Sequence, residues 1–363
     1  MAAFRHGRVA AVIESTDRII RALVETELGE LSAVGFPGML GPLNDGDEVV
    51  VNTTGIELGL GTGGVAFILW NISSTVMPEH GRGHIVKMRY TPWQTTVLAA
   101  EAPEGPHHEA LERARSIQGM PVVACPLHSQ VAAAAAGIRA AAPDARIGYL
   151  MTDGAALPLA WSELAQELCS KDLIDVTCTV GHAFGGDLEA VNVFSGLVAL
   201  RMGEKVDLAI VAMGPGVVGT NTALGFSAIE QGQILDAVTA LKGRPVAALR
   251  IAFHDGRDRH KGVSHHSLTA LTVAARERAT VVIPELTGLE RESMIHSQLE
   301  EAGVALKHDL VLASGRDGLN LLNDADIEPA SMGHRMRDAP ELFLAAAAAG
   351  SVAADPTKGR PLT

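Results

Sequence analysis

The sequence predicts an α/β protein with a small all-β domain ahead of a larger, mostly parallel, doubly wound α/β/α domain. The first hundred residues contain short runs rich in Val, Ile and Thr, separated by turns such as the segment at residues 44–47 (NDGD). From residue 111 onward, continuous apolar runs alternate with long Ala-rich stretches, which is typical of buried parallel strands covered by helices. Between the two parts, residues 101–106 (EAPEGP) contain two prolines and no apolar run, as a linker does.

In the first domain, placed at residues 1–100, the pattern predicts only strands. We expect them at residues 8–15, 18–26, 30–36, 48–53, 65–71, 85–90 and 95–100. Several short strands at regular spacing are typical of a small barrel or sandwich. A linker at residues 101–110 follows.

In the second domain, placed at residues 111–350, strands and helices alternate. We expect strands at residues 121–125, 146–152, 175–180, 206–213, 245–253, 280–283 and 309–313, and helices at residues 128–142, 158–169, 187–202, 227–241, 264–279 and 289–302. Seven strand–helix units favour an open, Rossmann-like sheet, since a closed barrel of this kind needs eight. A last helix follows residue 339, and residues 351–363 are predicted to be a disordered tail.

Composition narrows the class of partner. The 363 residues carry a formal net charge of −13, so the chain repels phosphate backbones, and we expect no nucleic-acid partner. No stretch approaches the roughly 20 apolar residues of a membrane span, so we expect no membrane partner either. Three cysteines are too few for a disulfide framework and favour a reducing cytoplasm.

Five segments together resemble an actinobacterial protein family that is catalogued as a domain of unknown function. The segments are NTTGIELGLGTGG, IGYLMTDGAALPLAWSEL, TVGHAFGGDLEAVNVFSG, AMGPGVVGTNTALGFSAIEQGQ and MGHRMRDAPELFLAAAAAG. The resemblance extends over nearly the whole chain. It implies a bacterial, cytoplasmic protein, but the family carries no assigned activity and therefore no functional residues to transfer.

Polar groups follow the predicted strands of the second domain. In open parallel sheets, ligands bind at the carboxyl ends of the strands. We therefore expect these groups to surround one cleft, and we take four of them as candidate acid–base residues: Asp153, His182, His254 and Asp255. Histidine titrates near neutral pH, and a carboxylate can orient it or remove a proton. The alternative is that they are ordinary hydrogen-bonded residues in polar loops.

A glycine-rich segment follows the fourth strand of that domain. Gly214, Gly216 and Gly219 form a G-x-G-x-x-G pattern, and Thr220 and Asn221 could cap the next helix. Such glycines let backbone N–H groups approach an anion at a helix N-terminus. We therefore predict an anion-binding loop, with a dinucleotide site and a purely structural turn as alternatives. A dinucleotide site also needs an acidic residue roughly 20 positions on, where this chain has none at a strand end.

Four further positions complete the candidate ligand-binding set. Gly185 and Gly186 follow the third strand of the domain, and Arg257 and His260 stand in the loop after the fifth strand. Arg257 could add a charge-assisted hydrogen bond to an anion.

A histidine-rich loop follows the fifth strand of the domain. Residues 253–266 (FHDGRDRHKGVSHH) hold His254, Asp255 and His260, which could ligate a metal together with His182. The spacing matches no established metal motif, so the alternative is that Ser264 caps a helix and the histidines are solvated. The sequence assigns no metal and no cofactor.

These observations predict a binder of, or an enzyme acting on, a small phosphorylated or carboxylated metabolite at the carboxyl edge of the sheet. Two alternatives stay open. One is a non-catalytic regulatory or assembly protein whose β domain binds a partner, and the other is a metal-dependent hydrolase that uses the histidine-rich loop. A homo-oligomer is compatible with each of them.

Overall fold

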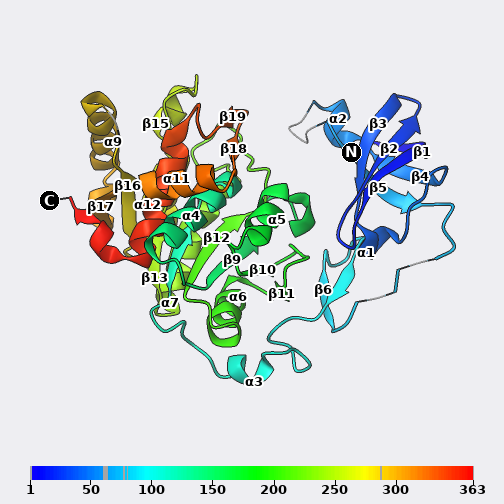
Figure 1. The fold of residues 1–363 in the computed structure, drawn as a ribbon, viewed down its shortest axis with the longest axis horizontal. Coiled ribbons are helices and arrows are strands. Elements are labelled where there is room, and N and C mark those ends of the chain that lie inside the picture. The colour runs from blue at the N-terminus through cyan, green and yellow to red at the C-terminus, as the bar shows by residue number, and fades with distance from the viewer. Residues whose placement is uncertain (1, 60–63, 77, 80, 287, 363) are drawn as a thin grey trace. The chain divides into compact units, whose positions relative to one another are not determined.

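The computed structural model describes residues 2–59, 64–76, 78–79, 81–286 and 288–362. The chain divides into two compact units, Met1–Val97 and Leu98–Thr363 (Figure 1). Each unit has its own hydrophobic core. Within the described ranges, no helix is both long enough and apolar enough to span a membrane.

The first unit is a closed five-stranded barrel, which confirms the predicted all-β fold. Its strands are β1 (Phe4–Ser15), β2 (Ile20–Thr26), β3 (Gly29–Gly35), β4 (Glu48–Asn52) and β5 (Ala66–Asn71), in the order β1-β2-β3-β5-β4. Neighbouring strands are antiparallel except β3 and β5, which are parallel. Alternate residues of β2 (Ile20, Ala22 and Val24) are buried, as expected for a strand with one face toward a barrel core.

Shorter elements complete the first unit. They are α1 (Pro37–Leu40), α2 (Thr54–Glu57) and a separate hairpin of β6 (Ile85–Lys87) and β7 (Thr95–Val97).

The second unit is built on a nine-stranded sheet. Its strands are β8 (Pro121–Ala124), β9 (Ile147–Thr152), β10 (Val176–Thr179), β11 (Leu188–Glu189), β12 (Leu208–Met213), β13 (Arg244–Ala247), β16 (Thr280–Pro284), β17 (Asp309–Ala313) and β20 (Arg360–Pro361). The order across the sheet is β11-β10-β9-β12-β8-β13-β16-β17-β20, and only β20 is antiparallel to its neighbour. Each of the seven predicted strands is present.

Helices cover both faces of this sheet, as predicted for a doubly wound fold. One core lies under α4 (Val131–Ala141), α5 (Glu163–Ser170), α11 (Arg316–Asp324) and α12 (Pro340–Ala354). The other lies under α6 (Val193–Val198), α7 (Glu230–Ala240), α9 (Leu289–Glu301) and α10 (Val304–Lys307). Because β8 leads to α4 and its neighbour β12 leads to α7 on the opposite face, their carboxyl ends form a topological switch point.

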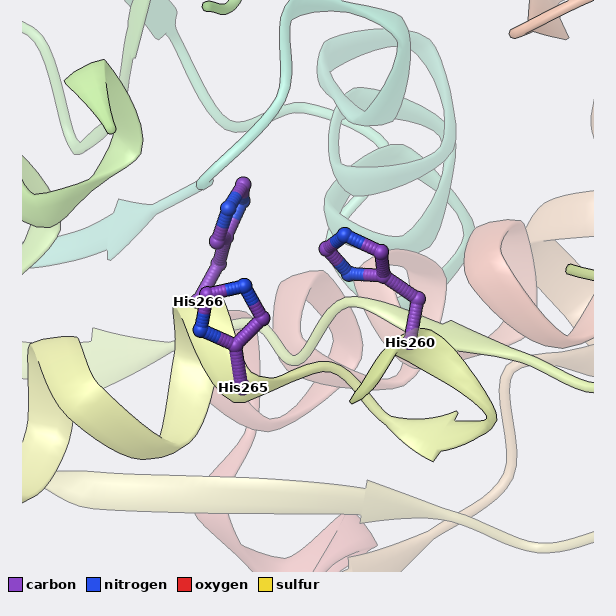
Figure 2. Close-up of side chains that lie close together, drawn as sticks. All are labelled: His260, His265 and His266. Carbon is purple, nitrogen blue, oxygen red and sulfur yellow. The ribbon is translucent and has the colours of Figure 1, made fainter. Parts of the chain in front are cut away.

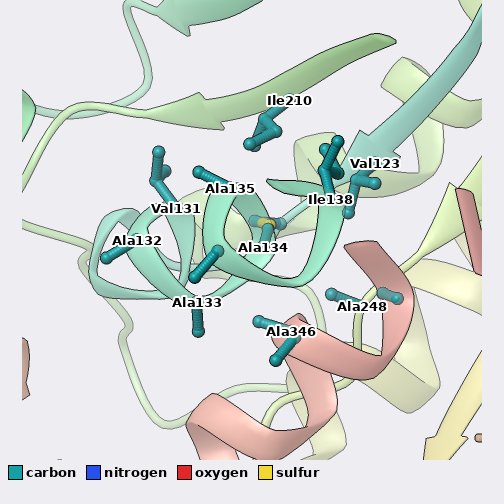
Figure 3. Packing of buried hydrophobic residues seen from close by; sticks show 14 of the residues in the cluster. Val123, Val131, Ala132, Ala133, Ala134, Ala135, Ile138, Ile210, Ala248 and Ala346 are labelled. Atoms are coloured by element: carbon teal, nitrogen blue, oxygen red, sulfur yellow. The ribbon is translucent and has the colours of Figure 1, made fainter. Parts of the chain in front are cut away.

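Small residues let α4 and α12 pack closely. A Cβ atom added at Gly137 would meet the backbone carbonyl of Ala347, and one at Gly350 would meet that of Ala134. Most core residues of both helices are alanines, and Figure 3 shows Ala133 and Ala134 of α4 facing Ala346 of α12. Few aromatic side chains are needed in this core, because small residues let the helix backbones approach closely and fill the space.

Residues 351–362 are ordered, which corrects the predicted disordered tail at residues 351–363, of which Thr363 lies outside the described residues. Residues 351–354 complete α12, where Ser351 donates a hydrogen bond to the carbonyl of Gly137 (3.2 Å). Residues 356–358 form a 3-10 turn, and β20 then pairs with β17. Pairing with the edge of the sheet orders this polar segment, and its composition alone does not reveal that partner.

The predicted strand at residues 245–253 is divided in two, β13 and β14 (Ile251–Ala252). Between them, the Gln130 side chain donates to the carbonyl of Leu249 (2.9 Å), and the Gln231 side chain donates to that of Ala248 (2.8 Å). These side chains replace sheet partners, so the backbone leaves the sheet before Arg250. β14 instead pairs with β15 (Gly262–Val263).

The predicted helix at residues 187–202 begins later than expected. Leu188–Glu189 forms β11, and α6 starts only after Asn192, which caps it by accepting from the backbone N–H of Ser195 (3.1 Å). Asp187 accepts hydrogen bonds from the backbone and hydroxyl of Thr177, which holds the segment at the sheet edge.

Candidate functional site

A cavity of about 190 Å³ lies at the carboxyl edge of the sheet, beside the end of β8. Segments that follow β8 and β13 line it, together with the hairpin of β18 (Ala330–Ser331) and β19 (His334–Arg335) and the first turn of α12. The lining residues are Leu127, Arg250, Ala252, His254, Asp255, Gly256, Arg257, Ser331, Met332, His334, Ala339, Leu342 and Phe343. The wall therefore combines apolar and polar side chains, and its charged groups all come from residues 250–257.

Arg257 and Asp255 form a two-pronged ion pair in the cavity wall. Nε and Nη2 of Arg257 donate to the two carboxylate oxygens of Asp255, at 2.9 and 2.7 Å. This hydrogen bonding holds the pKa of Asp255 well below its usual range and raises the pKa of Arg257. Asp255 is therefore ionised at neutral pH and already paired, which does not fit the predicted role of a general base.

Arg250 is a buried cation with weak partners. Its residue is 4% exposed, Nη1 donates to Nδ1 of His266 (3.2 Å) and Nη2 donates to the sulfur of Met332 (3.1 Å). The nearest carboxylate oxygen, on Asp255, is 3.9 Å from Nη2, too far for a hydrogen bond. Burial, and then the charge of Arg257, lower the pKa of Arg250 to about 10, so the side chain stays charged at pH 7.

His254 lies in the same wall, with its ring centroid 4.0 Å from that of His334. Burial, followed by the proximity of His334, lowers the pKa of His254. A largely neutral imidazole beside a cavity can exchange a proton with a ligand. Of the four predicted acid–base residues, His254 has the most suitable position.

Three other histidines form a cluster (Figure 2), and one of them, His266, accepts the hydrogen bond from Arg250. His260, His265 and His266 each offer one ring nitrogen, and these three atoms lie within 4.8 Å of one another. His260 ends a 3-10 turn (Asp258–His260), and His265 and His266 open the short helix α8 (His265–Thr269), which Ser264 caps. Of these three, the sequence indicated only His260 as a ligand. The alternative, in which Ser264 caps a helix and the histidines are solvated, is confirmed for the cap and wrong for His260 and His266, which are buried.

The glycine-rich segment lies against this cluster but does not open a helix. A Cβ atom added at Gly219 would lie 3.5 Å from Nε2 of His266. Thr220 donates through its backbone and its hydroxyl to the carbonyl of Gly225, and Asn221 adopts a positive φ of 64°. The next helical turn starts only at Ser227. The predicted capping by Thr220 and Asn221 is therefore wrong, because the loop uses these residues to close its own turn.

The other glycines of that segment have local roles. Gly214 is buried, and a Cβ atom there would meet the carbonyl of Ala156. Gly216 has a φ of 109°, which side chains rarely adopt, so glycine is needed for the backbone path.

Asp153 and His182 meet each other, but within the described chain neither lines the cavity. The Asp153 carboxylate accepts from the backbone N–H of His182 (2.8 Å), so it fixes a turn. Glu230, which sequence reasoning missed, lies nearby and accepts from the hydroxyl of Thr152 (2.6 Å). Burial raises the pKa of Glu230 to about 7.

Gly185 and Gly186 serve the turn between β10 and β11. Gly185 N–H donates to the Glu189 carboxylate (2.6 Å), and Gly186 N–H donates to the hydroxyl of Thr179 (3.1 Å). Their predicted ligand-binding role has no counterpart at the cavity, since both donors are used by neighbouring side chains.

Sequence reasoning also missed the two glutamines that shape the site. Gln231 bridges the carbonyls of Ala124 and Ala248, and Gln130 bridges those of Leu249 and Leu342, at 2.8–3.2 Å. They occupy the carbonyls at the carboxyl ends of β8 and β13, just before Arg250. A glutamine within an apolar helical stretch is the signal that could have identified them, because a buried amide needs partners.

The fold and the site together define an α/β protein with an N-terminal barrel and a basic cavity at the switch point of a doubly wound sheet. Residues 32–350 match the model of the protein family of unknown function DUF3866, and the chain belongs to this family. A comparison with curated proteins finds no significant match.

Proposed function

We propose that this protein binds a small anionic metabolite, carboxylated or phosphorylated, in the cavity at the carboxyl edge of its Rossmann-like sheet. The observation that supports this most directly is Arg250. It is a buried guanidinium whose nearest partners are an imidazole nitrogen, a thioether sulfur and a carboxylate 3.9 Å away. A buried charge with such partners gains free energy from a close anion.

The shape and charge of the cavity favour a small ligand. About 190 Å³ is below the roughly 300–1,000 Å³ of pockets that hold drug-sized molecules. Its charged groups are Arg250, Arg257 and Asp255, which leave one positive charge when the histidines are neutral. This local charge acts at contact distance, where salt does not screen it, whereas screening over ~8–10 Å weakens the repulsion from the net charge of −13.

His254 supports an enzymatic version of this proposal. Its ring lines the cavity, so an anion held by Arg250 would lie beside a group that can accept or donate a proton. The free cysteines Cys125, Cys169 and Cys178 agree with a cytoplasmic bacterial location, as the resemblance implies.

Isothermal titration calorimetry with inorganic phosphate and with succinate, both in EDTA, tests the proposal. Arg250→Met retains the volume and removes the charge, and it should weaken binding of the tighter ligand about tenfold or more, because charge-assisted hydrogen bonds contribute about 1.5–3 kcal/mol. Arg278→Met is the matched control, since Arg278 pairs with Asp309 near the amino ends of β16 and β17. Equal binding by wild type and Arg250→Met, or binding of neither anion, would refute it.

A further inference from the structure

A second site lies beside the cavity, at the histidine cluster of His260, His265 and His266. We propose that these three side chains bind one divalent transition-metal ion of the zinc class, and that binding releases Arg250 from His266. This inference goes beyond anion binding, because its ligands are different residues and its test needs no anion.

The geometry fits a three-histidine site. Nitrogens around tetrahedral zinc lie roughly 3.3 Å apart when each is about 2.0–2.1 Å from the metal. The three ring nitrogens here lie within 4.8 Å of one another, so the rings have to close by no more than roughly 1.5 Å. Three imidazoles leave a fourth position open, as in catalytic zinc sites.

Burial supplies the second, independent observation. His260 is 2% exposed and His266 6%, so two of the rings are withdrawn from water. Nε2 of His265 is also buried, and it has no hydrogen-bond partner within the described part of the chain. A buried polar atom in this state costs free energy, which a metal–nitrogen bond would recover.

Neighbouring groups hold the imidazole rings in place, as the residues around a metal site hold its ligands. Nδ1 of His260 is hydrogen-bonded to the hydroxyl of Ser264 (2.7 Å), which leaves Nε2 for a ligand. The ring of His266 is stacked on Phe226, with centroids 4.0 Å apart and planes inclined by 5°. The ring of His265 packs against the same phenyl ring, with centroids 5.6 Å apart and planes inclined by 71°.

Arg250 links this site to the cavity, because its hydrogen bond to His266 determines which ring nitrogen of His266 carries the proton. An arginine can only donate, so the hydrogen bond from Arg250 occupies the lone pair on Nδ1 of His266 and leaves the proton on Nε2. A metal bound through Nδ1 replaces Arg250 directly, and one bound through Nε2 requires that proton to move to Nδ1. In both cases Arg250 loses its acceptor on His266. The freed guanidinium then has the sulfur of Met332, the carboxylate of Asp255 (3.9 Å away) and the cavity as its remaining partners.

The test measures metal binding to the full chain. After removal of metal by a chelator, wild type should bind one equivalent of Zn²⁺ in calorimetry. His265→Phe keeps an aromatic ring against Phe226 and removes the nitrogen, so it should weaken Zn²⁺ binding at least about tenfold. His296→Ala, at an exposed position of α9, should bind like wild type. Arg250→Met should bind Zn²⁺ more tightly, because the competing donor and its charge are gone.

X-ray absorption of the zinc-loaded wild type should give three imidazole ligands, a result that depends on no variant. The inference is overturned if wild type takes up no zinc, if fewer than two imidazoles surround it, or if folded His265→Phe binds like wild type. Phosphate and succinate binding is measured in EDTA, so the two tests are independent. A failure to bind zinc does not affect the anion site, and a failure to bind anions does not affect the zinc site.

Discussion

At the scale of single residues, the fold raises the pKa of Glu230 into the neutral range. It begins α7, and its carboxylate accepts from Thr152 and faces Asp153. Burial is the main cause that raises its pKa from 4.5 to about 7, with a smaller contribution from the charge of Asp153. The folded protein therefore holds a proton here that the unfolded chain has released.

This difference predicts a pH-dependent stability. Between pH 4.5 and 7 the native state binds one proton more than the unfolded state, so the free energy of unfolding falls as pH rises through this window. Each pKa unit corresponds to about 1.4 kcal/mol, so the loss can reach about 3 kcal/mol. In Glu230→Gln this contribution is absent, and urea unfolding at pH 5 and pH 7.5 should show a flatter profile.

Glu290→Gln is the matched control, because Glu290 is an exposed glutamate in the first turn of α9. It should reproduce the wild-type profile. If Glu230→Gln and wild type lose the same stability between the two pH values, Glu230 does not titrate in this window.

The residue scale also explains why the cavity was only partly predictable. His254, Asp255 and Arg257 stand in an obviously polar loop, so the sequence indicated them. Arg250 stands in the apolar run PVAALRIAF, where a strand was expected. Its role depends on Gln130 and Gln231, which come from elsewhere in the chain and break that strand.

At the scale of elements, α4 and α12 pack so closely that their contact requires glycine at Gly137 and Gly350. Gly137 of α4 lies against the backbone of Ala347, with no room for a side chain. Alanine is a better helix former than glycine by about 1 kcal/mol, which favours Gly137→Ala. Overpacking costs about 1–3 kcal/mol and should dominate, because the atom it meets belongs to backbone.

We therefore expect Gly137→Ala to lower the free energy of unfolding by about 1–2 kcal/mol, measured by urea denaturation followed by circular dichroism. Gly38→Ala provides the comparison, since Gly38 lies in helix α1 and a Cβ atom there meets nothing within 4 Å. Its stability should be unchanged or slightly higher. An unchanged midpoint for Gly137→Ala would show that α12 can shift to accept the methyl group.

At the scale of the whole molecule, the two units meet in the sequence at Val97 and Leu98. The expected linker at residues 101–110 belongs to the second unit. Just before it, Ala100 is buried and donates through its backbone N–H to the carbonyl of Glu189 at the sheet edge (2.8 Å). Within it, the Glu101 carboxylate accepts from the backbone N–H of Val191 (2.9 Å), and α3 (His108–Leu111) begins. The composition of the segment resembles a linker, yet this pairing and the Glu101 side chain attach it to the second unit.

This pairing predicts where the chain can be cut. A fragment that starts at Leu98 should fold alone, with mixed α/β circular dichroism. A fragment that starts at Pro106 loses Ala99, Ala100 and Ala102, which are buried, and should melt roughly 4–8 °C lower if this costs about 2 kcal/mol. Equal melting temperatures would mean that residues 98–105 add nothing to the stability of the second unit.

The sequence by itself determined the two-part division, the barrel strands and the strands of the parallel sheet, because alternation and continuous apolar runs are local consequences of which faces are buried. It also indicated the polar loop that lines the cavity. Only the tertiary structure decided which loops meet. The order β9-β12-β8-β13 places Arg250 and three histidines together and leaves Asp153 and His182 outside the cavity lining. Strand order depends on how helices pack on the two faces of the sheet. These are contacts between distant segments, so no single segment of the sequence indicates the order.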